Sequence, residues 1–292
     1  MLLFYIYIFI QLYLQEINSS GTDFDYKDTC KWAKEFPMCG EKFQSPINIK
    51  IPNLESLGEL PPLKWNGYEN APTTMTLVNS GHSITLTGQW DDNNIPYITD
   101  GPLTDAYIFE QLHFHWGPND SVGSEHKMNG NSFPLEMHMV HFKKEYETFS
   151  NAVKYSDGLT VVGLFFDISP MGSEALTAIL GGVSAVSSSK DPFELDPFEL
   201  SSFNVAIAAV QFATYAGSLT TPPCSQSVIW ILPINTLNVS SKQMKKFRNI
   251  ELNHGDTHNY RPTQPLNGRS IHIFTQWSKL YMCDVYRSTT ET

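Results

Sequence analysis

The chain has 292 residues, 41% of them hydrophobic and 17% charged, and its formal net charge is −11 at pH 7. This composition supports a sizeable buried core and excludes a disordered chain, and the length fits two average domains or, as we favour, one large all-β or α/β domain. The acidic balance and the lack of a basic run argue against nucleic acid or an anionic membrane as partner, because binding phosphate requires clustered Lys and Arg.

The amino-terminal residues 2–14 form an apolar run of 13 residues without charge. The run is too short to span a bilayer and lies where the hydrophobic part of a secretory signal belongs, although no Lys or Arg precedes it. We predict a signal peptide over 1–20, a folded domain over 22–276 and a polar extension over 277–292. The expected product is secreted and extracellular, without a membrane span; the alternative is an uncleaved anchor or a misassigned start.

Alternating apolar and polar residues predict a chain built mainly of strands, which follow an irregular aromatic arm over residues 22–43. Strands are expected over 74–78, 83–87, 107–116, 135–142, 159–167, 205–211 and 228–233. Short peripheral helices are expected over 174–180 and, after a Ser cap, over 240–247. Residues 191–195 and 196–200 repeat the same five letters. We interpret them as an insertion in a surface loop rather than a functional motif.

The segment 109–117, with the sequence FEQLHFHWG, contains two histidines one residue apart. On an extended chain the side-chain period of two places Gln111, His113 and His115 on one face and apolar residues on the other. A single strand histidine is usually a core residue bonded to a carbonyl, but a pair on one face favours a bound cation.

A second alternating run, 135–141, places Glu136, His138 and Val140 on one face. If the two runs are adjacent strands, three histidines converge. Three neutral imidazoles without a nearby cysteine suit zinc, and three protein ligands leave a fourth position open for water, which is typical of a catalytic site. Gln111 and Glu136 lie two residues from ligands on the same faces and can orient the imidazole rings by hydrogen bonding.

Several segments together resemble the alpha-class carbonic anhydrases of the extracellular type, in the family's order and from about residue 24 to 274. The matching segments are 44–49 (QSPINI), 79–82 (NSGH), 111–117, 123–126 (GSEH), 136–141, 217–223 (GSLTTPP) and 259–262 (NYRP). The resemblance implies a mainly β (α+β) single domain on a large, mostly antiparallel twisted β-sheet with short peripheral helices. Zn2+, held by His113, His115 and His138, would lie at the base of a conical active-site cleft.

The implied reaction is the reversible hydration of carbon dioxide to bicarbonate and a proton. Zinc lowers the pKa of its bound water to about 7, a value known from carbonic anhydrase itself, and the resulting hydroxide attacks carbon dioxide. By resemblance, Thr220 orients this hydroxide and donates to Glu125, His82 shuttles the proton, and the Asn259 carbonyl orients His115. The plainer alternatives are a turn residue for Thr220, a surface charge for Glu125 and a solvated loop histidine for His82.

The substrate, small and apolar, would bind against an apolar wall beside the metal. Val140 shares the face of His138 by periodicity, and the resemblance adds the other positions. The implied substrate-binding residues are Val140, Val161, Leu219, Thr220, Thr221, Val228 and Trp230. Ordinary core packing would explain the apolar members equally well.

Four cysteines in a secreted chain predict two disulfides with three possible pairings. The resemblance pairs Cys39 with Cys224, while Cys30 and Cys283 could pair with each other, stay free or link chains. Three N-glycosylation sequons fit a secretory route, at Asn18, Asn119 and Asn238.

Two rival functions remain open. Catalytically silent relatives of carbonic anhydrase act as binding or matrix modules, but they typically lose a ligand histidine, whereas this chain keeps all three. The other rival is an esterase that uses the same zinc hydroxide. The sequence leaves the oligomeric state undecided.

Overall fold

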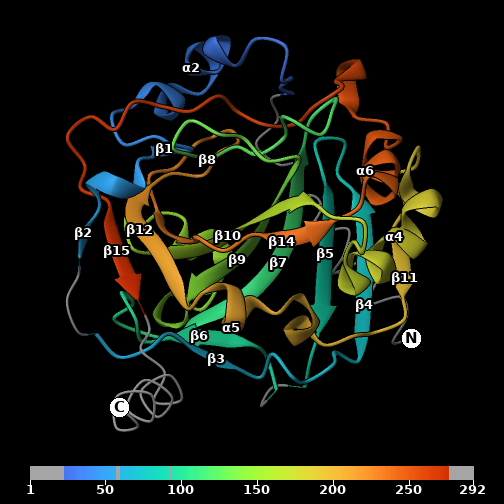
Figure 1. Cartoon of the computed structure of the whole chain (residues 1–292), viewed down its shortest axis with the longest axis horizontal. Helices are drawn as coiled ribbons and strands as arrows, with labels where there is room; N and C mark the ends of the chain where they lie inside the picture. Colours follow the sequence, from blue (N-terminus) through green and yellow to red (C-terminus); the bar gives the residue numbers. More distant parts are fainter. Residues whose placement is uncertain (1–22, 57–59, 92–93, 276–292) are drawn as a thin grey trace, which may run out of the picture.

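In the computed structural model, residues 23–56, 60–91 and 94–275 are described, and within these ranges the chain folds around one large twisted sheet (Figure 1). The strands are β1 (Asn48–Ile49), β2 (Glu55–Ser56), β3 (Lys64–Asn66), β4 (Thr74–Asn79), β5 (Ile84–Gln89), β6 (Tyr97–Thr99), β7 (Tyr107–Trp116), β8 (Lys127–Met128), β9 (Leu135–Lys143), β10 (Leu159–Ile168), β11 (Phe193–Leu195), β12 (Gln211–Gly217), β13 (Val228–Pro233), β14 (Leu237–Val239) and β15 (His272–Thr275). The α-helices are α2 (Trp32–Glu35), α3 (Phe149–Ala152), α4 (Glu174–Val186), α5 (Val205–Ala208) and α6 (Ser241–Arg248). The 3-10 helices are η1 (Thr29–Lys31), η2 (Pro37–Gly40), η3 (Ile51–Asn53), η4 (Lys144–Tyr146), η5 (Leu200–Phe203) and η6 (Asn253–Gly255).

The large sheet has the main strand order β11-β4-β5-β7-β9-β10-β13-β12-β15-β2. Most pairs are antiparallel, and the parallel pairs within it are β10 with β13, β10 with β14, and β15 with β2. The mainly β fold with a large, mostly antiparallel twisted sheet and short peripheral helices is therefore confirmed. The conical cleft implied by the resemblance stays a prediction.

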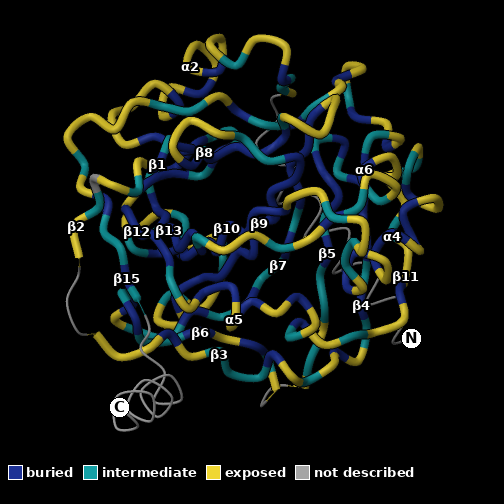
Figure 2. Tube along the Cα trace, viewed as in Figure 1, coloured by how far each residue is buried: buried dark blue, intermediate teal, exposed yellow. Residues whose placement is uncertain are grey.

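Burial is greatest along the central strands, which are dark blue in Figure 2, whereas the peripheral α2 is largely exposed. All nine residues of β9 are buried, because both faces of this strand are covered. One face packs into a large core that includes Leu112, Phe114 and Trp116 of β7. The opposite face carries the polar residues of the candidate site and a second apolar cluster. Alternation on β7 and β9 thus separates the core from the site.

The longer helices follow their capping residues. Ser240 caps α6 by accepting from the Gln243 backbone N–H, and the Gln243 side chain accepts from the Ser240 backbone in return, a complete capping box. Helix α4 begins after the cap Ser173 and continues to Val186, six residues beyond the predicted end. Within this extension, a Cβ on Gly182 would lie 2.7 Å from a Leu195 side-chain atom. The glycine therefore allows α4 to pack closely on β11.

Two interpretations of the sequence are wrong, one of a strand and one of the repeated segment. The predicted strand 205–211 is helical over Val205–Ala208, and the strand β12 begins only at Gln211. The four residues VAIA satisfy a helical spacing, since Val205 and Ala208 are buried and Ile207 is exposed.

The repeated five-residue segment is not a simple loop insertion. Its first copy forms the edge strand β11, which pairs antiparallel with β4. The leucines that end the two copies, Leu195 and Leu200, are both buried in the large core. Each copy therefore contributes to packing.

The predicted signal peptide 1–20 and the extension 277–292 lie outside the described residues. Among the residues that are described, no helix has the length and apolar character required to cross a bilayer. The bounds of the predicted domain, 22–276, stay a prediction.

Candidate metal centre

Three histidines converge where β7 and β9 run side by side. The antiparallel register places His113 opposite His138, and His115 lies two residues along the same face. The ring centroids are 5.0 Å apart for His113 and His115, 5.2 Å for His113 and His138, and 4.5 Å for His115 and His138. One nitrogen from each imidazole lies within 4.8 Å of the other two. The adjacency expected from the two alternating runs is present.

Each ring is held from outside by an oxygen atom. The contacts are Gln111 Oε1 with His113 Nδ1 (2.9 Å), the Asn259 carbonyl with His115 Nδ1 (2.7 Å) and Glu136 Oε1 with His138 Nε2 (2.7 Å). Because these oxygens only accept, each outer nitrogen carries the hydrogen and the opposite nitrogen presents a lone pair. The inward atoms are therefore Nε2 of His113, Nε2 of His115 and Nδ1 of His138.

The donor set fits a zinc ion. Burial lowers the pKa of His113 well below its usual value and that of His115 to about 3, so both rings are neutral, as metal ligands must be. The Nε2 atom of His115 is buried and has no hydrogen-bond partner among the described residues. Three imidazole nitrogens that converge in this way leave the fourth tetrahedral position free for water.

Glu136 organises the outer side of the site. Its Oε2 accepts from the backbone N–H groups of Glu125 and His126, both at 2.8 Å, and its Oε1 accepts from the imidazoles of His126 and His138. Burial alone would raise the pKa of Glu136, but the charges and hydrogen bonds of His126 and His138 hold it well below its usual range. The close group His126, Glu136 and His138 is thus a hydrogen-bonded network and not a second metal site.

A second buried carboxylate, Glu125, lies directly beside the inward nitrogens. Its Oε2 is 3.4 Å from His115 Nε2 and 3.9 Å from His138 Nδ1, and its Oε1 accepts from the Arg261 backbone N–H at 2.9 Å. Burial and the charge of Glu136 raise the pKa of Glu125 well above its usual range, against hydrogen bonds from Arg261 and from the Thr220 side chain. The structure therefore brings the predicted pair Thr220 and Glu125 together at the histidines.

The predicted apolar wall forms one cluster on the same face of the sheet. The register places Val140 opposite Val161, and Val161 opposite Trp230. Val228 belongs to the same cluster, and Leu219 packs against it. The adjoining Thr221 is half-buried. The Trp230 ring lies 4.8 Å from that of His138, so the wall reaches the ligands.

Sequence reasoning did not single out two further apolar residues that pack against the cluster to which this wall belongs. Phe149 and Val153, four residues apart on and just after α3, pack on the same cluster. Their i, i+4 spacing was the available signal, but a helix of four residues is too short to show a periodic pattern.

His82 lies in the turn between β4 and β5, beside the candidate centre. Its carbonyl accepts from the Asn259 side chain at 2.9 Å, and the Asn259 carbonyl in turn orients His115. The His82 ring stacks on Phe24 of the amino-terminal arm, with centroids 3.9 Å apart and planes inclined by 11°. Burial lowers the pKa of His82. A freely solvated loop histidine is excluded.

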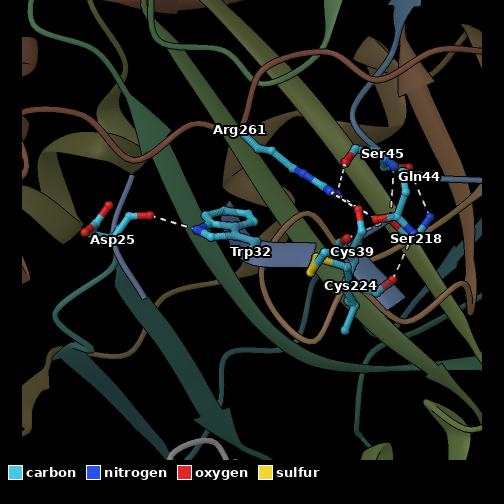
Figure 3. The surroundings of a disulfide bond; sticks show 9 residues. Asp25, Trp32, Cys39, Gln44, Ser45, Ser218, Cys224 and Arg261 are labelled. Atoms are coloured by element: carbon cyan, nitrogen blue, oxygen red, sulfur yellow. Dashed lines mark hydrogen bonds between the residues drawn. A yellow bond between two sulfur atoms is a disulfide. The ribbon is translucent and has the colours of Figure 1, made fainter. Parts of the chain in front are cut away.

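Cys39 and Cys224 form a disulfide, which ties the arm to the loop that carries Thr220 and Thr221 (Figure 3). Arg261 is the centre of this region. Its guanidinium donates to the carbonyl of Cys39 (2.9 Å), to Gln44 Oε1 (2.8 Å) and to the carbonyl of Ser45 (2.8 Å), and it lies over the ring of Trp32. Cys30 is exposed and forms no disulfide with another described cysteine, and Cys283 lies outside the described residues.

A series of buried, hydrogen-bonded side chains, which sequence reasoning also missed, reaches Glu136 through His126. His126 Nε2 contacts the Tyr215 hydroxyl at 2.7 Å, and this hydroxyl contacts Ser45 Oγ at 2.7 Å. The only signal in the sequence was that Ser45 and His126 lie inside the motif segments, as does Arg261, which contacts Ser45. Their contacts join residues up to 217 positions apart, which no local pattern reveals.

Comparisons with known proteins agree with this geometry. Residues 27–275 match the model of the eukaryotic-type carbonic anhydrase family. Carbonic anhydrase 7 of Homo sapiens is 37% identical over 254 residues, covering 82% of this chain and 91% of the relative. Carbonic anhydrase 7 of Mus musculus is 35% identical over 250 residues, with the same coverage. Since the family match spans most of the chain, the chain belongs to the eukaryotic-type carbonic anhydrase family.

Proposed function

We propose that this member of the family is a secreted carbonate dehydratase that uses zinc to hydrate carbon dioxide reversibly to bicarbonate and a proton. One observation carries the proposal. Three imidazoles with fixed outer nitrogens direct their free nitrogens to one point, beside an apolar wall and a buried Thr220 and Glu125 pair.

The residues that would hold zinc are His113 and His115 through Nε2 and His138 through Nδ1. When bound, zinc lowers the pKa of its water to about 7, as is known for carbonic anhydrase, and so supplies hydroxide at neutral pH. The outer oxygens of Gln111, Asn259 and Glu136 keep the rings aimed and increase their basicity. Glu136, as a buried anion, also offsets positive charge at the site.

Thr220 and Glu125 would direct the attack. The Thr220 hydroxyl would accept a hydrogen bond from the attacking oxygen and donate its own hydrogen to Glu125, whose ionised form the positive charge of a bound metal would favour against the effect of burial. The Arg261 backbone N–H, which donates to Glu125 Oε1, holds the carboxylate in place. The wall formed by Val140, Val161 and Trp230, with its neighbours, excludes water and accepts the apolar substrate. His82 would then take the proton.

Hydration and ester hydrolysis separate the three candidate activities. We expect the purified, zinc-loaded protein to hydrate carbon dioxide with a much higher kcat/KM than it shows for an activated ester. A silent binding module would show neither reaction. A protein that turned over the ester faster than carbon dioxide would be an esterase and would refute the proposal.

The secretory route has its own support. Cys39 and Cys224 form a disulfide, and such bonds persist in oxidising compartments. The sequon residues Asn119 and Asn238 are both exposed. We expect the protein expressed in animal cells to appear in the medium without residues 1–20 and with N-glycans removable by glycosidase. A product retained in the cytosol with its first residues intact would contradict secretion.

A further inference from the structure

A proton accepted by His82 needs a route onward. The arm residue Phe24 stacks on the His82 ring, Tyr26 approaches it edge-on with centroids 6.4 Å apart, and the His82 Nδ1 atom is buried without a partner among the described residues. Direct release into solvent is therefore restricted on the side that the arm covers. A neighbouring group that accepts protons and faces solvent would complete the route.

His254 lies in the adjoining turn. The Asn253 backbone N–H donates to the Gly81 carbonyl at 2.7 Å, and a Cβ on Gly81 would lie 2.5 Å from the Asn253 side chain. His82 and His254 each directly follow one of these two contacting residues. The His254 side chain is 33% exposed, and its Nε2 lies 2.9 Å from Asp23 Oδ1. His254 thus has the exposure that His82 lacks.

We propose that His82 and His254 form a two-histidine proton relay in which His82 receives the proton and His254 passes it to solvent. The inference rests on the proposed function, since hydration is what generates the proton. Asp23 accepts the Nε2–H of His254, which leaves Nδ1 as the accepting nitrogen. The proton passes from His82 to this nitrogen through solvent, because the two imidazoles make no direct contact, and His82 returns to the neutral form. His254 then releases one proton to buffer, and no other bond changes.

The charges around His82 come from several segments. Burial lowers the pKa of His82 most, Asp23 of the arm and Asp256 after η6 act to raise it, and His254 and Lys190 act to lower it. The Lys27 ammonium donates to the His254 carbonyl and so fixes the backbone of this residue. His82 therefore binds a proton weakly, which suits a group that must pass the proton on. Its charge state is coupled to that of His254.

The first test is His254→Gln, compared with His272→Gln. His272 is a matched control because its side chain is 34% exposed and also faces a carboxylate, with Nδ1 3.9 Å from Glu55 Oε2, but it belongs to β15, which lies between β12 and β2. In weak buffer, we expect His254→Gln to lower kcat for hydration at least about threefold and to leave kcat/KM unchanged, because the proton leaves after the attack. Imidazole should restore the turnover, and His272→Gln should behave as wild type.

If His254 only anchors the arm through Asp23, a different result is expected. Asp23→Asn removes the charge of the ion pair but retains His254 and a hydrogen-bond acceptor. The relay predicts that kcat falls much less in Asp23→Asn than in His254→Gln, whereas an anchor predicts equal losses. The double variant His82→Ala, His254→Gln should be no slower than His82→Ala alone, because the two residues act in series.

A readout independent of activity follows the His82 imidazole by NMR during a pH titration. His254→Gln should raise the midpoint of His82, since it removes the electrostatic influence by which His254 lowers the pKa of His82. An unchanged kcat in His254→Gln in weak buffer, or an unchanged His82 midpoint, would overturn the relay. A wild-type protein without hydration activity would instead refute the proposed function, while the coupling of the two histidines would still be visible by NMR.

Discussion

Lowering the pH from 7 to 5 should destabilise the fold through His141, a buried residue on the face of β9 opposite the metal centre. Its Nε2 contacts the Tyr68 hydroxyl, and burial lowers the pKa of His141 to about 3. A histidine in the unfolded chain has a pKa near 6.5. Between pH 6.5 and 3, His141 is therefore protonated in the unfolded state but neutral in the folded state. Stability is thus fully present above about pH 6.5 and declines as the pH falls. At pH 5 the loss due to this residue is about 2 kcal/mol.

Urea unfolding of wild type and His141→Gln at pH 7 and pH 5 isolates this contribution. The substitution changes packing at both pH values, but only wild type has the titrating imidazole. We expect the free energy of unfolding of the variant to fall by about 2 kcal/mol less than that of wild type between pH 7 and 5. Tyr68→Phe is the control, because it removes the phenol but retains the imidazole, and should keep the wild-type pH dependence. Equal pH dependence in wild type and His141→Gln would refute the reasoning.

Two further predictions concern the disulfide and His82. Replacing Cys39 and Cys224 by Ala removes a cross-link across a sequence separation of 185. The loss of unfolding free energy, measured by urea unfolding, should approach about 5 kcal/mol in the chain-entropy treatment, and an unchanged unfolding free energy would contradict the cross-link. His82→Ala should lower kcat for hydration but leave kcat/KM nearly unchanged, with recovery in imidazole buffer, and a proportional loss of kcat/KM would make His82 a structural residue of its turn.

The strands that carry the site could be predicted because their signal is local. The period of two in β7 and β9 is unbroken through the histidines, and the bounds of β7 match the prediction. The segment 205–208 failed for the opposite reason. Four small or apolar residues fit either period, and the left-handed backbone of Asn204 (φ 55°), which starts the helix, leaves no clear trace in the sequence. The edge strand β11 depends on pairing with β4, more than 100 residues earlier.

The candidate site, like the fold, has a part that local patterns predict and a part that depends on long-range contacts. The period of two and the spacing of the runs indicate His113, His115 and His138. Which nitrogen each ring presents depends on partners that include the Asn259 carbonyl, 144 residues from His115. The cover of Phe24 over His82 likewise depends on how the arm packs, and an irregular segment gives no periodic signal from which that packing could be inferred.

The central claim is that the three converging imidazoles hold the zinc on which carbon dioxide hydration depends. The most direct measurement is zinc affinity, by competition with a chelator, together with hydration rate, for wild type and for the Ala variants of His113, His115 and His138. We expect one zinc per wild-type chain. Each variant should lose affinity by more than the roughly 10- to 100-fold typical of a lost outer contact, and hydration should be lost with the metal. Wild-type zinc affinity in any of the three variants, or hydration that persists after complete removal of zinc, would contradict the claim.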